Sequence, residues 1–369
     1  MNRRFSQVSY FTIFLLAGVP AVVSAQPSHL TRNVIFVMTD GLRWQEVFQG
    51  ADAMLMNKES GSVSNPEELK RLYWRDTPAA RREALMPFLW QTLVKRGQIY
   101  GNRGAGSDAY VTNGYNFSYP GYSETLCGFA DPRINSNDKI PNPNVTVLEW
   151  LHRKQAYHGR VAAFGAWDVI SWIINSRRSG FTINSGYDPL KAPPITPRLE
   201  LLNRIKNDTR IWGDETFDSF AFQTALEYLK LHHPRILYLS LGETDVWAHD
   251  GNYEQYMNAT HRVDQLLQEL WDTVQSIGEY RGRTTLIFSP DHGRGEAPID
   301  WKGHGAKIPD SRYIWVAFLG PDTRALGERQ NIAPVTQSQI AATLAAFLGE
   351  DYARDVPKAG KPIYEVLPQ

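Results

Sequence analysis

The chain has 369 residues, of which 42% are hydrophobic and 21% are charged. This is the composition of an ordinary globular protein with enough length for one large core or two small ones, and it excludes intrinsic disorder. Lys plus Arg and Asp plus Glu are each 39, so no strong net charge recruits nucleic acid or an anionic membrane. We therefore expect no nucleic-acid polymer as a partner, and any charged substrate must be bound by a local site.

The first residues have the parts of a secretory signal peptide. A basic start leads into the apolar run 10–23 and then into small residues that end at Ala25. A membrane anchor is the alternative, but the run is shorter than the roughly 20 residues of a span, and Pro20 interrupts it. We expect residues 1–25 to be removed, leaving a periplasmic or secreted protein, residues 26–369, with no stable membrane span.

Apolar runs that are typical of buried strands alternate with segments of helical periodicity. The predicted strands cover residues 34–38, 161–164, 236–241, 284–288 and 313–319. The predicted helices cover residues 84–96, 145–154, 217–231, 253–277 and 337–348. Thr336 is the expected N-cap of the last helix, and Gly349 its C-terminal stop. The alternation predicts an α/β fold with a mainly parallel central sheet flanked by helices on both faces.

Two stretches, 131–144 and 179–216, are rich in Pro, Gly, Asn and Asp, and they predict long loops. The second follows Trp167 and Trp172. It could form a wall or lid over a site, or it could be a surface excursion with only a structural role. We expect a single catalytic domain in which segment 166–216 covers the site.

Carboxylates and imidazoles follow three of the predicted strands. Asp40 comes after strand 34–38, and the adjacent pair Asp291 and His292 comes after strand 284–288. The carboxyl ends of strands are where open α/β sheets build their sites. An isolated Asp after a strand is more often a turn or capping residue, so the interpretation of Asp40 as a ligand depends on the other candidate ligands.

Asp245 and His249 follow strand 236–241 and are four residues apart, a spacing that would put them on one face of a helical turn or across a compact loop. A polar loop with a capping Asp explains this pair equally well. His304 lies between two glycines, which let the backbone approach whatever the imidazole binds.

The candidate metal ligands are Asp40, Asp245, His249, Asp291, His292 and His304. Three carboxylates and three imidazoles suit zinc and are too rich in nitrogen for a magnesium or calcium cage. Two divalent ions would leave about one unit of positive charge beyond what three carboxylates neutralise, and the oxyanion of a nucleophilic hydroxyl could supply the balance.

These ordered motifs resemble the alkaline phosphatase superfamily, most closely its nucleotide pyrophosphatase/phosphodiesterase (type I phosphodiesterase) branch. The resemblance covers residues 33–41, 113–128, 239–251, 288–295 and 303–305. It implies an alkaline phosphatase-like three-layer sandwich and a hydrolase with two Zn²⁺ ions.

In that branch the nucleophilic Thr or Ser is followed by an aromatic residue, a Pro and, ten residues on, a Gly. Residues 118–128 have this order, so the resemblance makes Ser118 the expected nucleophile, at the start of a helical stretch. Ser118 as a simple N-cap is the alternative, and Thr112 and Ser123 are the rival hydroxyls. We interpret Cys127, the single cysteine, as a packing residue, because a lone thiol is more often buried than nucleophilic.

The family pattern implies one zinc on Asp40, Ser118, Asp291 and His292 and another on Asp245, His249 and His304. One ion would lower the pKa of the nucleophile, and the other would hold the leaving-group oxygen and later activate water. The expected reaction passes through a phosphoseryl intermediate. Adjacent side chains on a strand point apart, so holding both Asp291 and His292 on one ion requires a bend, which we expect at Gly293.

The branch commonly has an Asn three residues after the nucleophile, where this chain has Gly121. This departure favours phosphate monoesters slightly over diesters, and it leaves Asn113, Asn116 or Lys302 as candidate phosphate contacts. The substrate itself and the oligomeric state stay open.

Three alternatives remain. A formylglycine sulfatase needs Cys/Ser-x-Pro-x-Arg, and Tyr122 stands where that Arg belongs. A phosphotransferase or phosphomutase of the superfamily would act in the cytoplasm, so the expected export argues against it. A noncatalytic module that binds phosphorylated ligands would not need the full ligand set and the hydroxyl. The sequence therefore predicts an exported two-zinc metallohydrolase that acts on small phosphate esters.

Overall fold

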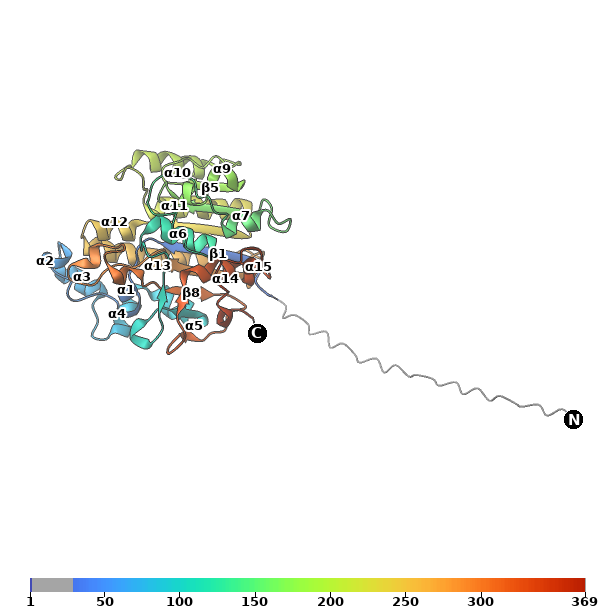
Figure 1. Cartoon of the computed structure of the whole chain (residues 1–369). Helices are drawn as coiled ribbons and strands as arrows, with labels where there is room; N and C mark the ends of the chain where they lie inside the picture. The colour runs from blue at the N-terminus through green and yellow to red at the C-terminus, as the bar shows by residue number, and fades with distance from the viewer. Residues whose placement is uncertain (2–28, 369) are drawn as a thin grey trace.

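The structure is a computed structural model that describes Met1 and residues 29–368. The predicted signal peptide falls almost entirely on residues outside this description. A central sheet runs through the molecule, with helices on both faces (Figure 1). The predicted α/β fold class is thereby confirmed.

The main sheet has eight strands. They are β1 (Asn33–Thr39), β2 (Gln98–Tyr100), β4 (Val161–Gly165), β5 (Thr182–Ser185), β6 (Ile236–Leu241), β7 (Thr284–Pro290), β8 (Val316–Leu319) and β9 (Gly327–Glu328). Their order is β5-β4-β6-β1-β7-β8-β2-β9, and neighbours are parallel except where β8 pairs with β7 and with β2. A small second sheet joins β3 (Ala109–Tyr110) to β10 (Val335–Thr336).

The helices surround this sheet. They are α1 (Trp44–Gln49), α2 (Lys58–Gly61), α3 (Pro66–Tyr73), α4 (Pro78–Leu85), α5 (Val94–Arg96), α6 (Ser118–Cys127), α7 (Val147–His152), α8 (Ile170–Ile173), α9 (Ser176–Ser179), α10 (Pro197–Asp208), α11 (Asp218–His232), α12 (Glu243–His249), α13 (Tyr253–Ser276), α14 (Ile340–Phe347) and α15 (Tyr352–Asp355). Among the described residues, no helix combines the length and the apolar character that crossing a membrane requires.

Strand β1 separates two layers of core. Phe36 and Met38 belong to a cluster with residues of α6, α7 and α14, whereas Ile35 and Val37 belong to a cluster with residues of α11 and α13. A strand buried on both faces must be apolar at successive positions, which explains its continuous apolar sequence. Because β1 is packed on both faces, its carboxyl end, where Asp40 lies, is held rigidly.

All five predicted strands of the sheet are present, although β8 begins three residues later than predicted. The predicted helices 217–231 and 253–277 are confirmed as α11 and α13. Thr336 forms a capping box with Gln339, and Gly349 has φ 77°, so both ends of the last predicted helix are confirmed.

The prediction of one helix over residues 84–96 was wrong. Helix α4 ends at Leu85, Met86 has φ −130° and ψ 70°, and helical structure resumes at Pro87. A residue before proline is disfavoured in helical conformation, and this restriction divides the segment.

The interpretation of residues 179–216 as one long loop was also wrong, because the segment contains β5 and α10. Thr196 accepts a hydrogen bond from the Leu199 amide, and Pro197 occupies the first helical turn. This cap-and-proline start was a sequence signal for α10. In Figure 1, α9 and α10 lie at the top of the molecule, above α6 and α12.

A buried ion pair connects the end of β1 to the loop after β7. Arg43 and Glu46 are both fully buried and hydrogen-bonded, with Arg43 Nε 2.8 Å from Glu46 Oε2. Tyr253 also donates to Glu46, at 3.1 Å, and Arg43 Nη1 donates to the carbonyl oxygen of Gly295 at 3.1 Å. Removing one partner of such a pair leaves an uncompensated buried charge.

We predict that Glu46→Gln lowers the free energy of unfolding by about 3 kcal/mol, because it leaves the buried Arg43 guanidinium with only the Asp52 carboxylate, 3.8 Å away, as its counter-charge. Urea denaturation measures this loss. Glu68→Gln is the matched control, since Glu68 pairs with Arg71 on the exposed surface of α3 and its replacement should leave the urea midpoint unchanged. An unchanged midpoint for Glu46→Gln would contradict this role of the pair.

Candidate metal centre

Three adjacent strands deliver the candidate ligands to one edge of the sheet. Asp40 follows β1, Asp245 lies on α12 directly after β6, and Asp291 and His292 follow β7. The order β6-β1-β7 is parallel throughout, so these three carboxyl ends meet. Ser118 is the first residue of α6.

Asp40, Asp291 and His292 form a buried group with ligand atoms within 4.8 Å of one another. His292 Nε2 lies 3.2 Å from Asp40 Oδ1 and 3.5 Å from Asp291 Oδ2. The Ser118 hydroxyl joins this group, with Oγ 3.4 Å from Asp40 Oδ1 and 3.3 Å from His292 Nε2.

A second group contains Asp245, His292 and His304. His304 Nε2 lies 3.6 Å from Asp245 Oδ1, and His249 Nε2 lies 3.2 Å from Asp245 Oδ2. His249 and His304 approach each other with 2.9 Å between their Nε2 atoms. The structure therefore brings all six candidate ligands and Ser118 together, with His292 between the two groups rather than on one side.

Several nitrogen and oxygen atoms in this cluster have lone pairs that are free to bind a cation. The carbonyl oxygen of Gly293 lies 2.8 Å from His292 Nδ1 and can only accept, so Nδ1 carries the proton and the Nε2 lone pair faces Asp40 and Asp291. Asp291 Oδ2 is buried and has no hydrogen-bond partner among the described residues. The Nε2 atoms of His249 and His304 face each other and also fit ligands of a cation. The residues fit divalent metal ions with mixed nitrogen and oxygen ligands.

Burial dominates the electrostatics of the cluster. It raises the pKa of Asp40 and of Asp291 well above the usual range, and neighbouring carboxylates add to both shifts. Burial is the main cause that lowers the pKa of His304 to about 2, so His304 is neutral and its nitrogen lone pair is available. A set of buried carboxylates this close together is unfavourable unless positive charge is present among them.

Arg294 is a site residue that sequence reasoning missed. Its guanidinium is buried, forms an ion pair with Asp245 and donates to the carbonyl oxygen of Lys302 at 2.6 Å. Burial raises the pKa of Asp245, but Arg294 and His249 outweigh it and hold that pKa well below its usual range. The signal was its position two residues after His292, since a buried Arg beside ligands needs a carboxylate partner.

The expected role of Gly293 as the flexible bend was wrong. Gly293 does not have a positive φ. A Cβ at this position would lie 2.1 Å from the carbonyl oxygen of Tyr313, and the Gly293 amide donates to the carbonyl oxygen of Ser311 at 2.7 Å. Glycine is required here for close packing against another backbone segment.

Gly121 has a similar explanation. A Cβ at this position would lie 2.3 Å from the carbonyl oxygen of Asp291. Helix α6 therefore approaches the backbone of a ligand too closely for any side chain, which accounts for the absence of an Asn at this place.

The rival hydroxyls are engaged elsewhere. Thr112 Oγ1 donates to Glu124 at 2.7 Å, and Ser123 Oγ accepts from the amide of Asn142 at 3.0 Å. The N-cap of α6 is Phe117, and the Ser118 hydroxyl makes no capping bond, so the alternative of Ser118 as an N-cap was wrong. Cys127 is buried, and burial raises the pKa of its thiol to about 12, which agrees with a packing role.

The three candidate phosphate contacts differ in whether their side chains are free to bind a substrate. The Asn113 amide nitrogen donates to Glu124 at 2.9 Å, and its oxygen accepts from the backbone of Tyr115 and Asn116, so this side chain holds its own loop. Asn116 is buried with φ 54°. Lys302 is exposed, and its side chain lies beside Gly251, close to the end of α12.

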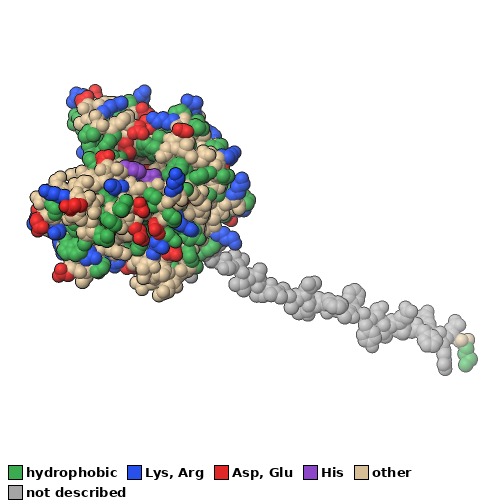
Figure 2. All heavy atoms as spheres, turned by 60° about the vertical axis from the view of Figure 1, so that its left-hand side comes forward, with side chains coloured by type: hydrophobic (Ala, Val, Ile, Leu, Met, Phe, Trp, Pro, Cys, Tyr) green, Lys and Arg blue, Asp and Glu red, His purple; other side chains and the backbone are tan. Residues whose placement is uncertain are grey.

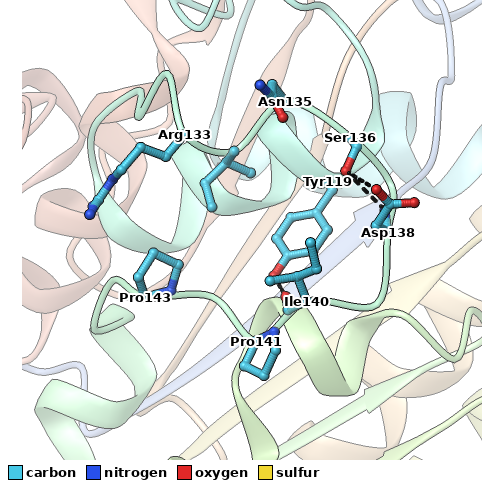
Figure 3. Close-up of a pocket in the computed structure, with 9 residues that line it drawn as sticks. Tyr119, Arg133, Asn135, Ser136, Asp138, Ile140, Pro141 and Pro143 are labelled. Carbon is cyan, nitrogen blue, oxygen red and sulfur yellow. Dashed lines mark hydrogen bonds between the residues drawn. The ribbon is translucent and has the colours of Figure 1, made fainter.

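One face of the molecule is hollowed (Figure 2). Figure 2 shows histidine side chains in a hollow, with acidic side chains beside them. A different cavity of about 260 Å³ lies beside α6, and Figure 3 shows Tyr119, Ile140 and Pro141 among the residues that line it. The Tyr119 hydroxyl donates to the Ile140 carbonyl at 2.6 Å, and this cavity contains none of the candidate ligands.

Comparison with known proteins agrees with this site. Residues 212–349 match the model of the Metalloenzyme superfamily, a range that includes Asp245, Asp291 and His304. Over 155 residues the chain is 24% identical to a 2,3-bisphosphoglycerate-independent phosphoglycerate mutase of Saccharolobus islandicus. That alignment covers 40% of this chain and 35% of the mutase, so the chain spans about a third of the length of this relative.

Solved structures show the same fold. The wild type alkaline phosphatase PafA superposes with a TM-score of 0.59 and 11% identity, over 93% of this chain and 100% of that chain. A protein of the alkaline phosphatase superfamily from Vibrio parahaemolyticus gives a TM-score of 0.53 and 15% identity, over 91% of this chain and 70% of that one. The predicted alkaline phosphatase-like fold is confirmed, and residues 212–349 match the Metalloenzyme superfamily. These matches do not single out the nucleotide pyrophosphatase/phosphodiesterase branch.

We predict that adding Zn²⁺ to chelator-treated protein raises its melting temperature, because a ligand that binds only the folded state stabilises it by about 2.7 kcal/mol at one hundred times its Kd. Asp291→Asn should reduce this shift, since it removes a buried ligand charge. Differential scanning calorimetry measures both proteins. Asp355→Asn, on exposed α15, should respond like the wild type, and a wild-type protein indifferent to divalent cations would refute the site.

Proposed function

We propose that this chain, which has the alkaline phosphatase-like fold and a match to the Metalloenzyme superfamily, is a phosphate ester hydrolase that uses Ser118 as its nucleophile. The observation that carries the proposal is the position of Ser118 Oγ, 3.4 Å from Asp40 and 3.3 Å from His292 at the first turn of a ten-residue helix. A hydroxyl beside candidate metal ligands, with a helix N-terminus behind it, is placed to act as an oxyanion.

Asp40, Asp291 and His292 would hold one Zn²⁺ beside Ser118, and Asp245, His249 and His304 would hold the second. When bound, two such ions supply charge stabilisation for both the attacking and the leaving oxygen. Arg294 positions Asp245 through its ion pair, and the Gly293 carbonyl orients His292. The described side chains thus form a preorganised frame for in-line displacement at phosphorus.

The proposed reaction has two displacements. Ser118 Oγ attacks phosphorus, the bond to the ester oxygen breaks, and the alcohol leaves as a phosphoseryl group forms. Water then attacks the same phosphorus, the bond between Ser118 Oγ and phosphorus breaks, and phosphate is released. In the first step the proton of the Ser118 hydroxyl, which points to Asp40, is lost from Oγ and one proton is gained by the departing alcohol oxygen. In the second step the attacking water loses a proton and Ser118 Oγ regains one.

Monoesters are the favoured substrates, with diesters close behind. Gly121 has no space for the amide side chain that is common in the diesterase branch, because the Asp291 carbonyl lies against it. We also propose export to the periplasm or the exterior, supported by the signal-like start of the sequence. Segment 166–216 is proposed to cover the site, supported by the position of α9 and α10 above α12 (Figure 1).

A second candidate activity is phosphoryl transfer between substrates, as in a phosphomutase. The observation that favours it is the 24% identity over 155 residues to the phosphoglycerate mutase. Hydrolysis remains the better-supported proposal, because PafA, an alkaline phosphatase, is covered over its whole length. A noncatalytic module that binds phosphorylated ligands would leave the Ser118 hydroxyl without a role.

We predict that Ser118→Ala loses nearly all activity on p-nitrophenyl phosphate, by about 10³-fold or more in kcat, because the nucleophile is gone. Metal analysis of the same samples should find two zinc ions per wild-type chain. Ser123→Ala is the matched control on α6, and it should retain activity. The ratio of rates on p-nitrophenyl phosphate and bis-p-nitrophenyl phosphate decides between monoesterase and diesterase.

Full activity of Ser118→Ala would refute the nucleophile, and wild-type protein without bound metal would refute the zinc centre. Release of p-nitrophenol without free phosphate, in the presence of an acceptor alcohol, would favour the phosphotransferase instead.

A further inference from the structure

Glu215 adds a carboxylate to the edge of the sheet at which the metal centre lies. Residues 214–216 run beside the end of β4: the Asp168 amide donates to the Asp214 carbonyl at 2.9 Å, and the Thr216 amide donates to the Ala166 carbonyl at 3.0 Å. Trp167 and Glu215 form the bridge between these two segments. Backbone hydrogen bonds therefore fix Glu215 in place, although it comes from the connection between α10 and α11.

Gly242 makes room for this carboxylate. A Cβ at Gly242 would lie only 1.4 Å from Glu215 Oε1, and the φ of Gly242 is −127°, a value that any residue adopts. Glycine is therefore needed at this position for space and not for backbone conformation. Glu215 thus packs over the end of β6, directly before the helix that carries Asp245 and His249.

The Glu215 carboxylate has no hydrogen-bond partner among the residues that the structure describes. Its Oε1 is buried, and no described residue donates a hydrogen bond to it. Burial raises the pKa of Glu215 well above its usual range, and the nearest charges, on Asp40, Asp218 and Asp245, add to this effect. A buried carboxylate among other carboxylates is costly unless a positive group comes beside it.

Trp167 supplies an aromatic surface next to this carboxylate. Its indole nitrogen donates to Asp214 at 3.1 Å, and its ring lies 6.5 Å from the ring of Tyr122, one helical turn beyond Ser118. Trp167 therefore lies between the nucleophile's helix and the Asp214–Glu215 segment. An aromatic face beside carboxylates is the arrangement that binds organic cations.

A metal ion fits this place less well than an organic cation. The ligand atoms that the described residues gather within 4.8 Å of one another form two groups, and Glu215 is in neither. A divalent cation held by oxygen ligands takes six or more of them. An ammonium group needs only one carboxylate and an aromatic face.

We propose that Glu215 and Trp167 bind a positively charged ammonium group on the alcohol portion of the phosphate ester. This inference rests on the proposed hydrolase function, and it makes Glu215 a specificity-determining residue of that site. The substrate class is a phosphate ester of an amino alcohol, held by its phosphate at the metal centre and by its ammonium group at Glu215.

The test compares phosphocholine with 3,3-dimethylbutyl phosphate, which has the same shape and a carbon in place of the charged nitrogen. For the wild type we expect kcat/KM to be about tenfold higher or more for phosphocholine, the preference that a desolvated cation–π contact with a nearby carboxylate provides. Glu215→Gln should lower this ratio to about 1 through KM, with activity on p-nitrophenyl phosphate retained. Glu200→Gln, on the exposed face of α10, is the matched control and should keep the wild-type ratio.

A wild-type ratio near 1, or an unchanged ratio in Glu215→Gln, would overturn the inference. Loss of a bound metal ion in Glu215→Gln, with the ratio unchanged, would identify Glu215 as a metal ligand instead and would also overturn it. If the wild type hydrolyses none of the three esters, the proposed function fails, and calorimetric titration with phosphocholine decides this inference separately. Binding to the wild type and not to Glu215→Gln would support it, and absence of binding to the wild type would overturn it.

Discussion

The main physical constraint on this structure is the unfavourable electrostatic free energy of placing several buried carboxylates at one edge of a parallel sheet. Asp40, Asp245 and Asp291 converge because β6, β1 and β7 are neighbours that all end at the same edge. Ionised carboxylates in such surroundings repel one another and lose their hydration, so positive charge must be present for the arrangement to be stable. Arg294 supplies one positive charge through Asp245. The rest of the deficit is what divalent cations would neutralise, and it links folding of this edge to ligand binding.

Small residues allow the groups around this edge to approach one another. Gly121 places α6 against the Asp291 carbonyl, and with it the Ser118 hydroxyl against the ligand cluster. Gly242 makes the corresponding space for Glu215 on the β4 side. The same feature, absence of a side chain, therefore makes room both for the helix of the proposed nucleophile and for the proposed specificity residue. The proposed substrate preferences rest on these contacts as well as on the candidate ligands.

Sequence patterns predicted the parts of the fold whose signals are local. The apolar runs of β1, β6 and β7 were found because strands buried on both faces are apolar throughout, and the ends of the last helix were found from Thr336 and Gly349. The break before Pro87 was missed, because a proline disfavours helical conformation in the residue before it. The helix after Thr196 was missed, because a proline is also favourable in the first turn of a helix. Glu215 was missed for another reason, because nothing in its local sequence indicates burial beside distant carboxylates. Arg294 had only its position two residues after His292 as a signal.

The sequence by itself determined the chemical inventory of the site: the ligand types, a hydroxyl at a helix start, and the strand ends from which the ligands project. These are properties of single segments, fixed by residue identity and local periodicity. Only the tertiary structure decided how the inventory is arranged. It placed His292 between two ligand groups, oriented its imidazole through the Gly293 carbonyl, and added Arg294 and Glu215 to the charge balance. The physical reason is that distances between side chains far apart in sequence are set by strand order and close backbone packing, and no local pattern encodes these.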